Sequence, residues 1–285
     1  MSEPDGAVWR FGHASVAGTA HLREGRGCQD VGCCAVVAPA GDPGVLVACG
    51  ADGAGSAPRG EEGARLACAS FLESVSELYR PEQGDGAPDE LARPAWWARL
   101  VEAWLTRFRD RVAQAAEPDR SDRREFACTF LGAVVADGWA GLVQIGDGAI
   151  VVDGGDGLES YASFVWPRRG EYANETYFAT DDRAAEHVDL DLLPRRIDEI
   201  ALLTDGLQGL VLDYARRAPH GPFFARVFAP FRAASDDCAA LSAQLAAFLA
   251  SPRVRARTDD DTTLILATRR TEPVEPVAAS VGADL

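Results

Sequence analysis

The stretch VLVACGADGAG, residues 45–55, decides the fold class, because a strand-like apolar run ends in an aspartate followed by glycines. The same order returns in IALLTDG, residues 200–206, where the apolar run ends at Asp205. Carboxylates at the ends of buried strands repel one another and lose hydration unless a cation offsets their charge. Hard divalent metals prefer oxygen ligands, so we expect a metal-dependent hydrolase if these strand ends meet in space.

The Asp-Gly dipeptide is a weak signal by itself, because most such pairs only form turns. It occurs eight times in this chain. Context singles out Asp52 and Asp205, and also Asp147, which follows the apolar run Leu142–Ile145. A further acidic run, residues 259–261, stands immediately before an apolar stretch. These four places are the candidates for one shared site.

Composition excludes several classes of function. The chain has 285 residues, 47% of them hydrophobic and 25% charged, which is ordinary for a soluble globular protein. Its formal net charge of -16 argues against nucleic acid or an anionic membrane as a partner. The chain contains no lysine, which excludes a lysine-dependent P-loop and a Schiff-base mechanism.

The seven cysteines show no spacing typical of a zinc site. Most lie inside apolar runs, so we interpret them as small buried hydrophobic residues in a reducing compartment. The first residues, MSEPDGAVWR, lack a basic region followed by an apolar stretch, so we expect no signal peptide, and no apolar run approaches the roughly 20 residues that span a bilayer. We therefore expect a cytoplasmic protein.

Apolar periodicity predicts strands that come in runs, with helices between the runs. Amphipathic helices are expected around Ala64–Leu78 and Trp97–Val112, the latter with Trp97 and Trp104 as core anchors, and after the cap Ser235. Pro81–Pro94 is predicted to be an exposed loop. The predicted strands are Val8–Val16, Val31–Ala38, Val45–Ala51, Phe126–Ala136, Trp139–Ile145, Ile150–Val152, Leu158–Val165, Thr176–Ala179, Ile200–Thr204 and Thr262–Thr268.

This order of elements favours antiparallel α+β layers over a doubly wound parallel sheet. No repeat or long linker interrupts the chain, so we expect a single domain over residues 1–270. Residues 271–285 form an acidic segment that we expect to be a disordered tail.

Taken in order, the acidic motifs resemble those of the metal-dependent serine/threonine protein phosphatases, the type 2C or PPM family, and most closely its compact bacterial branch. The resemblance extends from about residue 11 to residue 268. The matching motifs are Cys28-Gln29-Asp30, Ala51-Asp52-Gly53-Ala54-Gly55-Ser56, Cys128-Thr129-Phe130-Leu131, Ile145-Gly146-Asp147-Gly148, Ala173-Asn174-Glu175-Thr176, Leu203-Thr204-Asp205-Gly206-Leu207 and Asp260-Asp261-Thr262-Thr263-Leu264. The family implies a four-layer α-β-β-α sandwich, with two central, mostly antiparallel sheets flanked by helix pairs.

The resemblance also implies a site with two Mn²⁺ or Mg²⁺ ions. Asp52 and the Gly53 carbonyl, with Asp205 and Asp260, would be the metal ligands, and Asp147 with Asp205 would hold a third, weaker ion. Such ions activate a water that attacks phosphorus. The carboxylates expected to take part in catalysis are Asp30, Asp52, Asp205 and Asp260, with Asp30 orienting metal-bound water. Asp260 is preferred to Asp261 because it keeps Thr263 in step with the family.

Two positions depart from the family pattern. Many members have a histidine where this chain has Ala54, which leaves the acid for the leaving group open. The position of the phosphate-binding arginine is Gly25 here, and its neighbour Arg26 is our candidate, with a solvated loop arginine as the alternative. We expect His21 to have a hydrogen-bonding role in the loop.

The resemblance implies a phosphorylated protein as the partner, the substrate of a serine/threonine kinase, and we expect a monomer. Two alternatives stay open. One is a catalytically weak signalling or binding module on the PPM fold, which Ala54 and the displaced arginine favour. The other is a hydrolase of small phosphate esters, which only substrate tests distinguish from a protein phosphatase.

Overall fold

The computed structural model describes residues 9–38, 44–79, 91–154, 160–167, 176–234 and 238–269. Two five-stranded sheets form its centre, and all of their strand pairs are antiparallel. The first sheet has the order β2 (Val31–Val37), β3 (Val45–Ala51), β4 (Phe130–Ala136), β5 (Trp139–Ile145) and β8 (Asp189–Leu193). The second has the order β1 (Trp9–Val16), β12 (Thr262–Arg269), β9 (Glu199–Leu203), β6 (Ala149–Asp153) and β7 (Tyr161–Val165).

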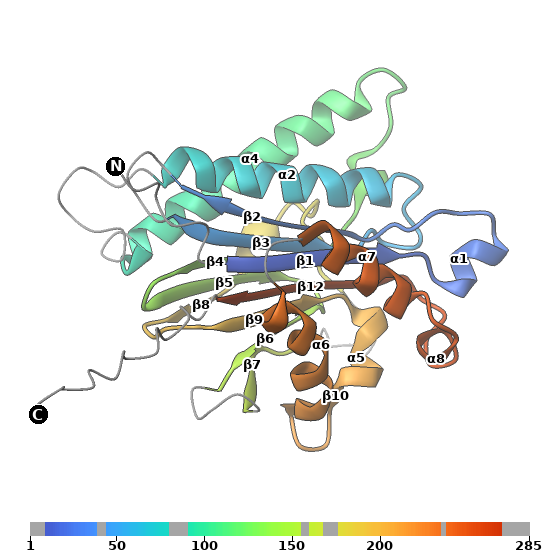
Figure 1. Ribbon diagram of the computed structural model, residues 1–285. Coiled ribbons are helices and arrows are strands. Elements are labelled where there is room, and N and C mark those ends of the chain that lie inside the picture. Colours follow the sequence, from blue (N-terminus) through green and yellow to red (C-terminus); the bar gives the residue numbers. More distant parts are fainter. Residues whose placement is uncertain are drawn as a thin grey trace, which may run out of the picture.

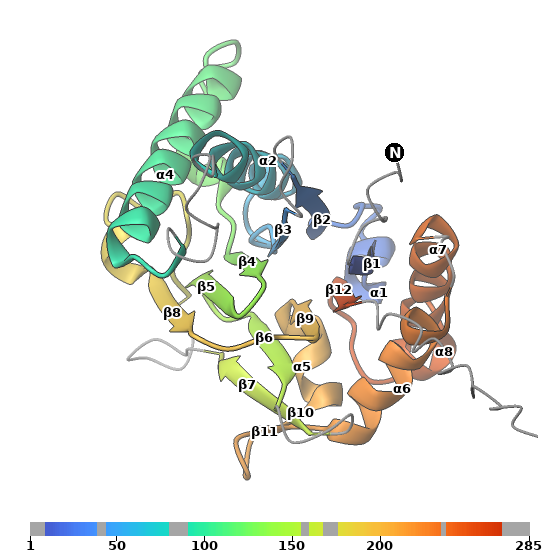
Figure 2. The same ribbon diagram turned by 60° about the vertical axis from the view of Figure 1, so that its left-hand side comes forward.

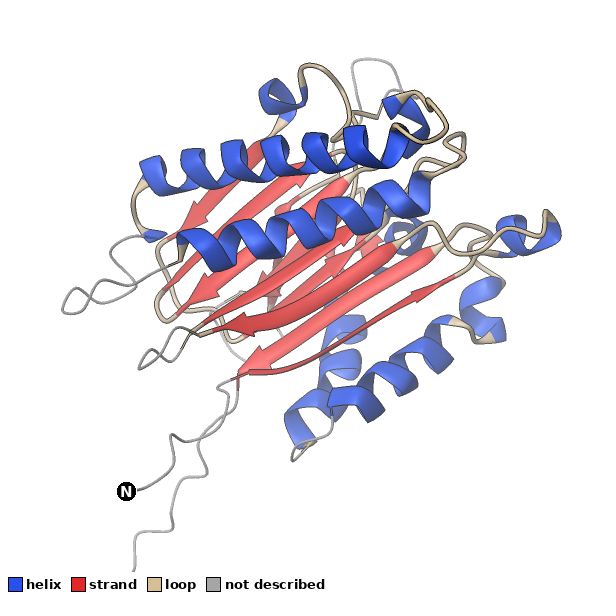
Figure 3. Cartoon of the chain, turned by 90° about the horizontal axis from the view of Figure 1, so that it is seen from above, coloured by secondary structure: helices blue, strands red, loops and turns tan. Residues whose placement is uncertain are grey.

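Helices cover the outer face of each sheet (Figures 1 and 2). Helices α2 (Gly60–Leu78) and α4 (Pro94–Ala116) pack on the first sheet, and α6 (Gly221–Ala233) and α7 (Cys238–Leu249) pack on β1 and β12 of the second. Figure 3 shows the strands running between these two helical layers. The expected four-layer α-β-β-α sandwich is therefore confirmed. The shorter elements are α1 (Thr19–Arg23), α5 (Asp205–Val211), α8 (Pro252–Arg255), the 3-10 turns Arg123–Phe126 and Ala184–His187, and the small ladder of β10 (Leu212–Asp213) with β11 (Ala218–Pro219).

Aromatic side chains fix the first helical layer on its sheet. Trp97 and Trp104 are both fully buried, as predicted from their spacing. The Trp104 ring centroid lies 4.1 Å from that of Phe130 on β4, and its indole nitrogen donates to the Ala67 carbonyl of α2 at 3.1 Å. Satisfying the indole N–H inside an apolar layer lets a large ring anchor the helix pair without leaving a polar group unpaired.

A second apolar cluster fills the space between the two sheets, with Leu46 and Leu142 facing Ile200 and Ile265. A third lies between the second sheet and its helices. Alternation along each strand assigns successive side chains to opposite faces. The two sheets are thereby held as neighbouring layers, and their strand ends are brought to a common edge.

The strand registers place the expected acidic motifs at one end of the sandwich. Val31 pairs with Ala51, so the start of β2 lies beside the end of β3. Leu203 pairs with Leu264, so the end of β9 lies beside the start of β12. The loops that carry the candidate aspartates leave the sheets at this end, where α1 and α8 also lie (Figure 1).

Several predicted elements need correction. Strand β4 begins at Phe130 rather than at Phe126, because residues 123–126 form a 3-10 turn with Asp122 in a capping box. Thr176–Ala179 is not a strand: the Asp181 carboxylate accepts from the Phe178 backbone amide at 2.9 Å, which closes the chain into a turn. The predicted cap Ser235, most of the loop 81–94, residues 173–175 and the tail 271–285 lie outside the described residues.

None of the helices in the described part of the chain combines the length and the apolar character needed to cross a bilayer.

Candidate functional site

The segment that carries Asp52 is held between two neighbouring chain segments. The Asp52 carbonyl accepts from the Thr129 amide at 2.8 Å, and the Gly53 amide donates to the Gln29 carbonyl at 3.2 Å. A β-carbon on Gly53 would approach the Gln29 carbonyl oxygen to 2.9 Å, so this close approach requires glycine. The backbone thus fixes Asp52 between the residues that lead to Asp30 and those that lead into β4.

Asp30 is buried immediately before β2, with 4% of its surface exposed. Its Oδ2 accepts from the Thr204 hydroxyl at 2.7 Å, and its Oδ1 has no hydrogen-bond partner among the described residues. Thr204 follows β9 of the other sheet, and its Oγ1 also accepts from the Thr263 amide at 3.0 Å. This hydroxyl therefore joins the ends of both sheets beneath a carboxylate with an unsatisfied oxygen.

Asp205 is the first residue of α5, directly after Thr204. The next residue, Gly206, packs so closely that a β-carbon there would overlap the Asp261 carbonyl oxygen. This contact holds the start of α5 against the chain that enters β12. As a result, Asp205 lies within electrostatic range of Asp260, Asp147 and Asp52.

Asp260 and Asp261 have different environments, although they are adjacent in the chain. Asp261 is buried, and its carboxylate accepts from the Gly18 amide at 2.7 Å, from His21 Nδ1 at 2.9 Å and from the Gln29 amide at 2.6 Å. Asp260 is exposed and interacts electrostatically with Asp52 and Asp205. Asp261 therefore holds the loop by hydrogen bonds, and one of them comes from His21, for which a hydrogen-bonding role in the loop was expected. Asp260 instead faces the other carboxylates.

Asp147 lies at the edge of this group. Its Oδ2 accepts from the Thr176 hydroxyl at 3.2 Å, and its backbone carbonyl accepts from the Gln208 side chain on α5. Its charge raises the pKa of Asp205. The fold therefore brings together every aspartate that the sequence selected.

The clustered aspartates at this end of the molecule have raised pKa values. Burial, followed by the charges of Asp261 and Asp205, raises the pKa of Asp30 to about 7. Burial, followed by Asp260 and Asp147, raises the pKa of Asp205 to about 7, and burial and neighbouring carboxylates also raise the pKa of Asp52. Within the described residues no arginine forms a salt bridge with Asp30, Asp52, Asp205 or Asp260. Clustered oxygen donors that include an orphaned buried oxygen fit hard divalent cations.

Arg26 lies beside the loop that follows Asp52. Its guanidinium donates to the Gly55 carbonyl at 2.8 Å and pairs with the exposed Glu24 carboxylate. These contacts place it near the candidate site, with its side chain 39% exposed. Its role in binding phosphate stays a prediction.

Sequence reasoning missed the residues that hold the carboxylates in place. Thr204 joins the two sheets through Asp30, and Asp261 gathers three donors from the segment of residues 18–29. The sequence did offer a sign of the role of Thr204, because this residue directly precedes Asp205. The sequence offered no sign of the role of Asp261, since its partners lie more than 200 positions away in the chain.

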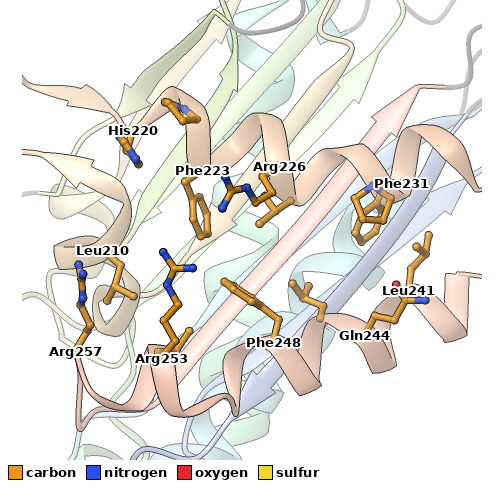
Figure 4. Close-up of a pocket in the computed structure, with 15 residues that line it drawn as sticks. Leu210, His220, Phe223, Arg226, Phe231, Leu241, Gln244, Phe248, Arg253 and Arg257 are labelled. Carbon is orange, nitrogen blue, oxygen red and sulfur yellow. The ribbon is translucent and has the colours of Figure 1, made fainter.

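A pocket of about 560 Å³ lies elsewhere, between α6, α7 and α8 (Figure 4). Its lining combines rings such as Phe223 and Phe248 with the basic side chains of Arg226 and Arg253. None of the candidate aspartates lines it. It is therefore separate from the carboxylate site.

Comparison with known proteins identifies the family. The profile described as "Protein phosphatase 2C" matches residues 17–250. Serine/threonine-protein phosphatase 3 of Escherichia coli strain K12 is 39% identical over 263 residues, which cover 91% of this chain and 98% of that protein. The chain therefore belongs to the protein phosphatase 2C family and is a protein phosphatase, a phosphoric monoester hydrolase, as the order of its acidic motifs indicated.

Solved structures agree on the fold. The serine/threonine phosphatase Stp1 from Staphylococcus aureus is 15% identical with a TM-score of 0.58, and the match covers 95% of this chain and 99% of that one. The catalytic domain of the phosphatase PstP, crystallised with two manganese ions, is 17% identical with a TM-score of 0.55, over 93% and 99%.

Proposed function

We propose that this phosphatase hydrolyses phosphoserine and phosphothreonine in proteins with the help of two divalent cations, Mn²⁺ or Mg²⁺. The proposal rests chiefly on one observation: Asp30, Asp52, Asp205 and Asp260 come from four distant segments and meet where no described arginine forms a salt bridge with them. The manganese-bound PstP structure and the E. coli relative support it from outside the chain.

The proposed ligands are the oxygens that face one another at this end of the sandwich. They are Asp52, the Gly53 carbonyl, Asp205 and Asp260, with Asp147 and Asp205 available for a third ion. When bound, the cations would supply a water of lowered pKa and would neutralise charge on the phosphoryl group. Asp261 is excluded from the ligand set because its carboxylate already accepts three hydrogen bonds.

The chain's own residues have separate roles in this proposal. Asp30, fixed by Thr204, keeps one oxygen free to accept a hydrogen bond from the attacking water. Arg26, next to Gly55, binds the substrate phosphate at the rim of the site. The substrate is a phosphoprotein, the product of a serine/threonine kinase, which the similarity to the E. coli serine/threonine-protein phosphatase supports.

The assay is direct. Purified protein is incubated with a phosphothreonine peptide, and released phosphate is measured with Mn²⁺, with Mg²⁺ and with excess EDTA. We expect release with metal and none with EDTA, and restoration when Mn²⁺ is added back. Hydrolysis of p-nitrophenyl phosphate without hydrolysis of the peptide would instead assign the protein to the small phosphate esters. No hydrolysis of either substrate with any metal would contradict the proposal.

A further inference from the structure

Three cysteines that are scattered along the sequence meet on the face of the first sheet that α2 covers. They are Cys33 on β2, Cys49 on β3 and Cys68 on α2, and their sulfur atoms all lie within 4.8 Å of one another. The Sγ atoms of Cys33 and Cys49 are 3.1 Å apart. The spacing of the cysteines in the sequence gave no sign of this cluster, because it depends on strand register and on the position of α2.

Cys33 and Cys49 are opposed residues in the antiparallel pair β2–β3. Opposed residues in antiparallel pairs have Cα atoms about 4.5 or 5.5 Å apart, and both distances fall within the range of about 4.4–6.8 Å found for disulfides. The sulfur atoms need to approach by only about 1 Å to reach the bond length of about 2.05 Å. The backbone therefore does not have to move for these two residues to form a disulfide.

Access and reactivity differ within the cluster. Cys33 lies on β2, the edge strand of its sheet, and is half-buried, whereas Cys49 and Cys68 are buried, with exposures of 0% and 2%. Interaction with the Cys49 thiol, followed by that of Cys68, lowers the pKa of Cys33 to about 4. Interaction with Cys33, followed by Cys68, raises the pKa of Cys49. The thiolate is the reactive form of cysteine, so the cluster has one accessible nucleophile with a partner already in contact.

The ligand set and the net charge of the cluster favour a disulfide over a metal centre. The described residues add no histidine or carboxylate to the three sulfurs, so a bound Zn²⁺ would lack its usual fourth protein ligand. Three thiolates with one Cu⁺ or Zn²⁺ would also leave net negative charge in the apolar layer that contains Cys49 and Cys68. A disulfide is neutral and leaves no charge behind.

We propose that Cys33 and Cys49 form a reversible disulfide when the protein meets a hydroperoxide, with Cys33 as the reacting thiol and Cys49 as the resolving thiol. The proposal does not rest on the proposed phosphatase mechanism. Disulfides of this kind in reducing compartments are transient and redox-linked. Cys68 lies beside both sulfurs, and its own thiol donates to the Val31 carbonyl at 3.9 Å.

The chemistry balances in two steps. The Cys33 thiolate attacks one peroxide oxygen, so that an S–O bond forms and the O–O bond breaks; the other oxygen leaves and takes a proton, giving water or an alcohol. Cys33 is thereby oxidised by two electrons to a sulfenic acid, and the peroxide is reduced. The Cys49 sulfur then attacks the Cys33 sulfur, the S–S bond forms, the S–O bond breaks, and the hydroxide leaves as water with the Cys49 proton.

The sequence offers a simple test. Asp42-Pro43 is the single Asp-Pro bond in the chain, and warm dilute acid cleaves such bonds. Cleavage separates Cys33 from Cys49, so the two fragments stay together on a non-reducing gel only when a disulfide joins them. The reduced, folded protein is treated with a few equivalents of hydrogen peroxide, blocked with N-ethylmaleimide in denaturant, and then cleaved.

We expect most of the wild-type protein to remain linked and to separate after reduction with dithiothreitol. Cys34→Ser is the matched control, because Cys34 is the next residue on β2 and packs toward the other sheet; it should stay linked. Cys33→Ser and Cys49→Ser should both separate. Circular dichroism confirms that each variant is folded.

Tandem mass spectrometry of the linked wild-type fragments identifies the joined sulfurs without any variant. A bond between Cys33 and Cys49 supports the proposal. Wild-type protein that separates after peroxide treatment, with Cys33 carried on to a sulfinic acid, would overturn it. Linkage that persists in Cys49→Ser, or that requires Cys34, would overturn it as well.

Discussion

Acidic side chains lie at both ends of strand β9, but their surroundings differ. At its start, Glu199 is 4% exposed and accepts from Arg232 at 2.6 and 2.7 Å and from the Tyr161 hydroxyl at 2.7 Å. Just beyond its end, Asp205 lies among Asp52, Asp147 and Asp260, and burial, followed by the charges of Asp260 and Asp147, raises its pKa to about 7. Only residues 200–204 separate a carboxylate that is paired with an arginine from one that is not.

This contrast shows which charges the fold itself stabilises. A buried carboxylate with a cation and hydrogen bonds around it has a structural role, and removing it leaves its partner unpaired. Buried carboxylates that surround one another are a cost to the folded state unless a ligand supplies positive charge. The acidic end of the sandwich is therefore arranged for a function and not for stability.

The largest expected effect is on catalysis at the unbalanced end. Asp52→Asn keeps the side-chain shape and removes one ligand charge, so kcat should fall on the order of 100-fold or more. Without metal, the melting temperature should stay equal or rise, because a like charge has been removed. Phosphate release and thermal melts in EDTA measure both. Asp137→Asn, at the Asp-Gly turn between β4 and β5, is the matched control and should retain full activity.

At the start of β9, substitution of the paired carboxylate should lower stability and leave activity nearly unchanged. Glu199→Gln leaves the Arg232 guanidinium without its charge partner, and we expect a loss of about 2 kcal/mol in the free energy of unfolding, reduced by the partial exposure of Arg232. Activity with Mn²⁺ should change little at temperatures where the variant is folded. Chemical denaturation measures the loss; an unchanged stability would show that the Glu199–Arg232 pair is not a net structural contact.

The pH dependence of metal-free stability sharpens the comparison further. The pKa of Asp30 and of Asp205 is about 7 in the folded protein and 3.8 for an unperturbed aspartate. The folded state thus binds more protons between these values, and the stability of the metal-free protein should fall as the pH rises from about 4 to about 7. Thermal melts in EDTA at several pH values test this. Asp205→Asn should show a shallower fall, and an identical fall would contradict the assignment.

The smallest expected effect concerns the rim of the site. Arg26→Ala should raise KM for a phosphothreonine peptide about fivefold with little change in kcat, because Arg26 is partly exposed and its pairing is screened by solvent. Arg23→Ala, at the last residue of α1 and three positions before Arg26, is the matched control. Equal KM values for the two variants would remove Arg26 from phosphate binding and leave the carboxylate site unaffected.

The local sequence pattern was sufficient to predict the strands and helices whose apolar periodicity is strong. Strands β3 and β5 begin and end where the apolar runs Val45–Ala51 and Trp139–Ile145 do, and the tryptophan stripe of α4 is buried as its spacing predicts. The candidate aspartates were found because each follows or precedes such a run. Their meeting at one end follows from antiparallel register, which short runs of sequence do not reveal.

The elements that were missed depend on contacts between distant residues. Helix α1 is too short to be stable alone and is tied to Asp261 through Gly18 and His21. The Thr176–Ala179 segment has the composition of a strand, but it forms a turn, and the Ala179 amide at this turn donates to the distant Cys128 carbonyl. Tertiary hydrogen bonds overrode local propensity in both places.

The central claim, that this end of the sandwich leaves its charge balance to bound cations, is tested most directly by equilibrium binding of Mn²⁺ to the EDTA-treated protein at pH 7.5. We predict saturable binding of two ions to the wild type and to Glu199→Gln, and loss of that binding in Asp52→Asn. Equal binding by Asp52→Asn and the wild type, or no saturable binding by either, would contradict the account.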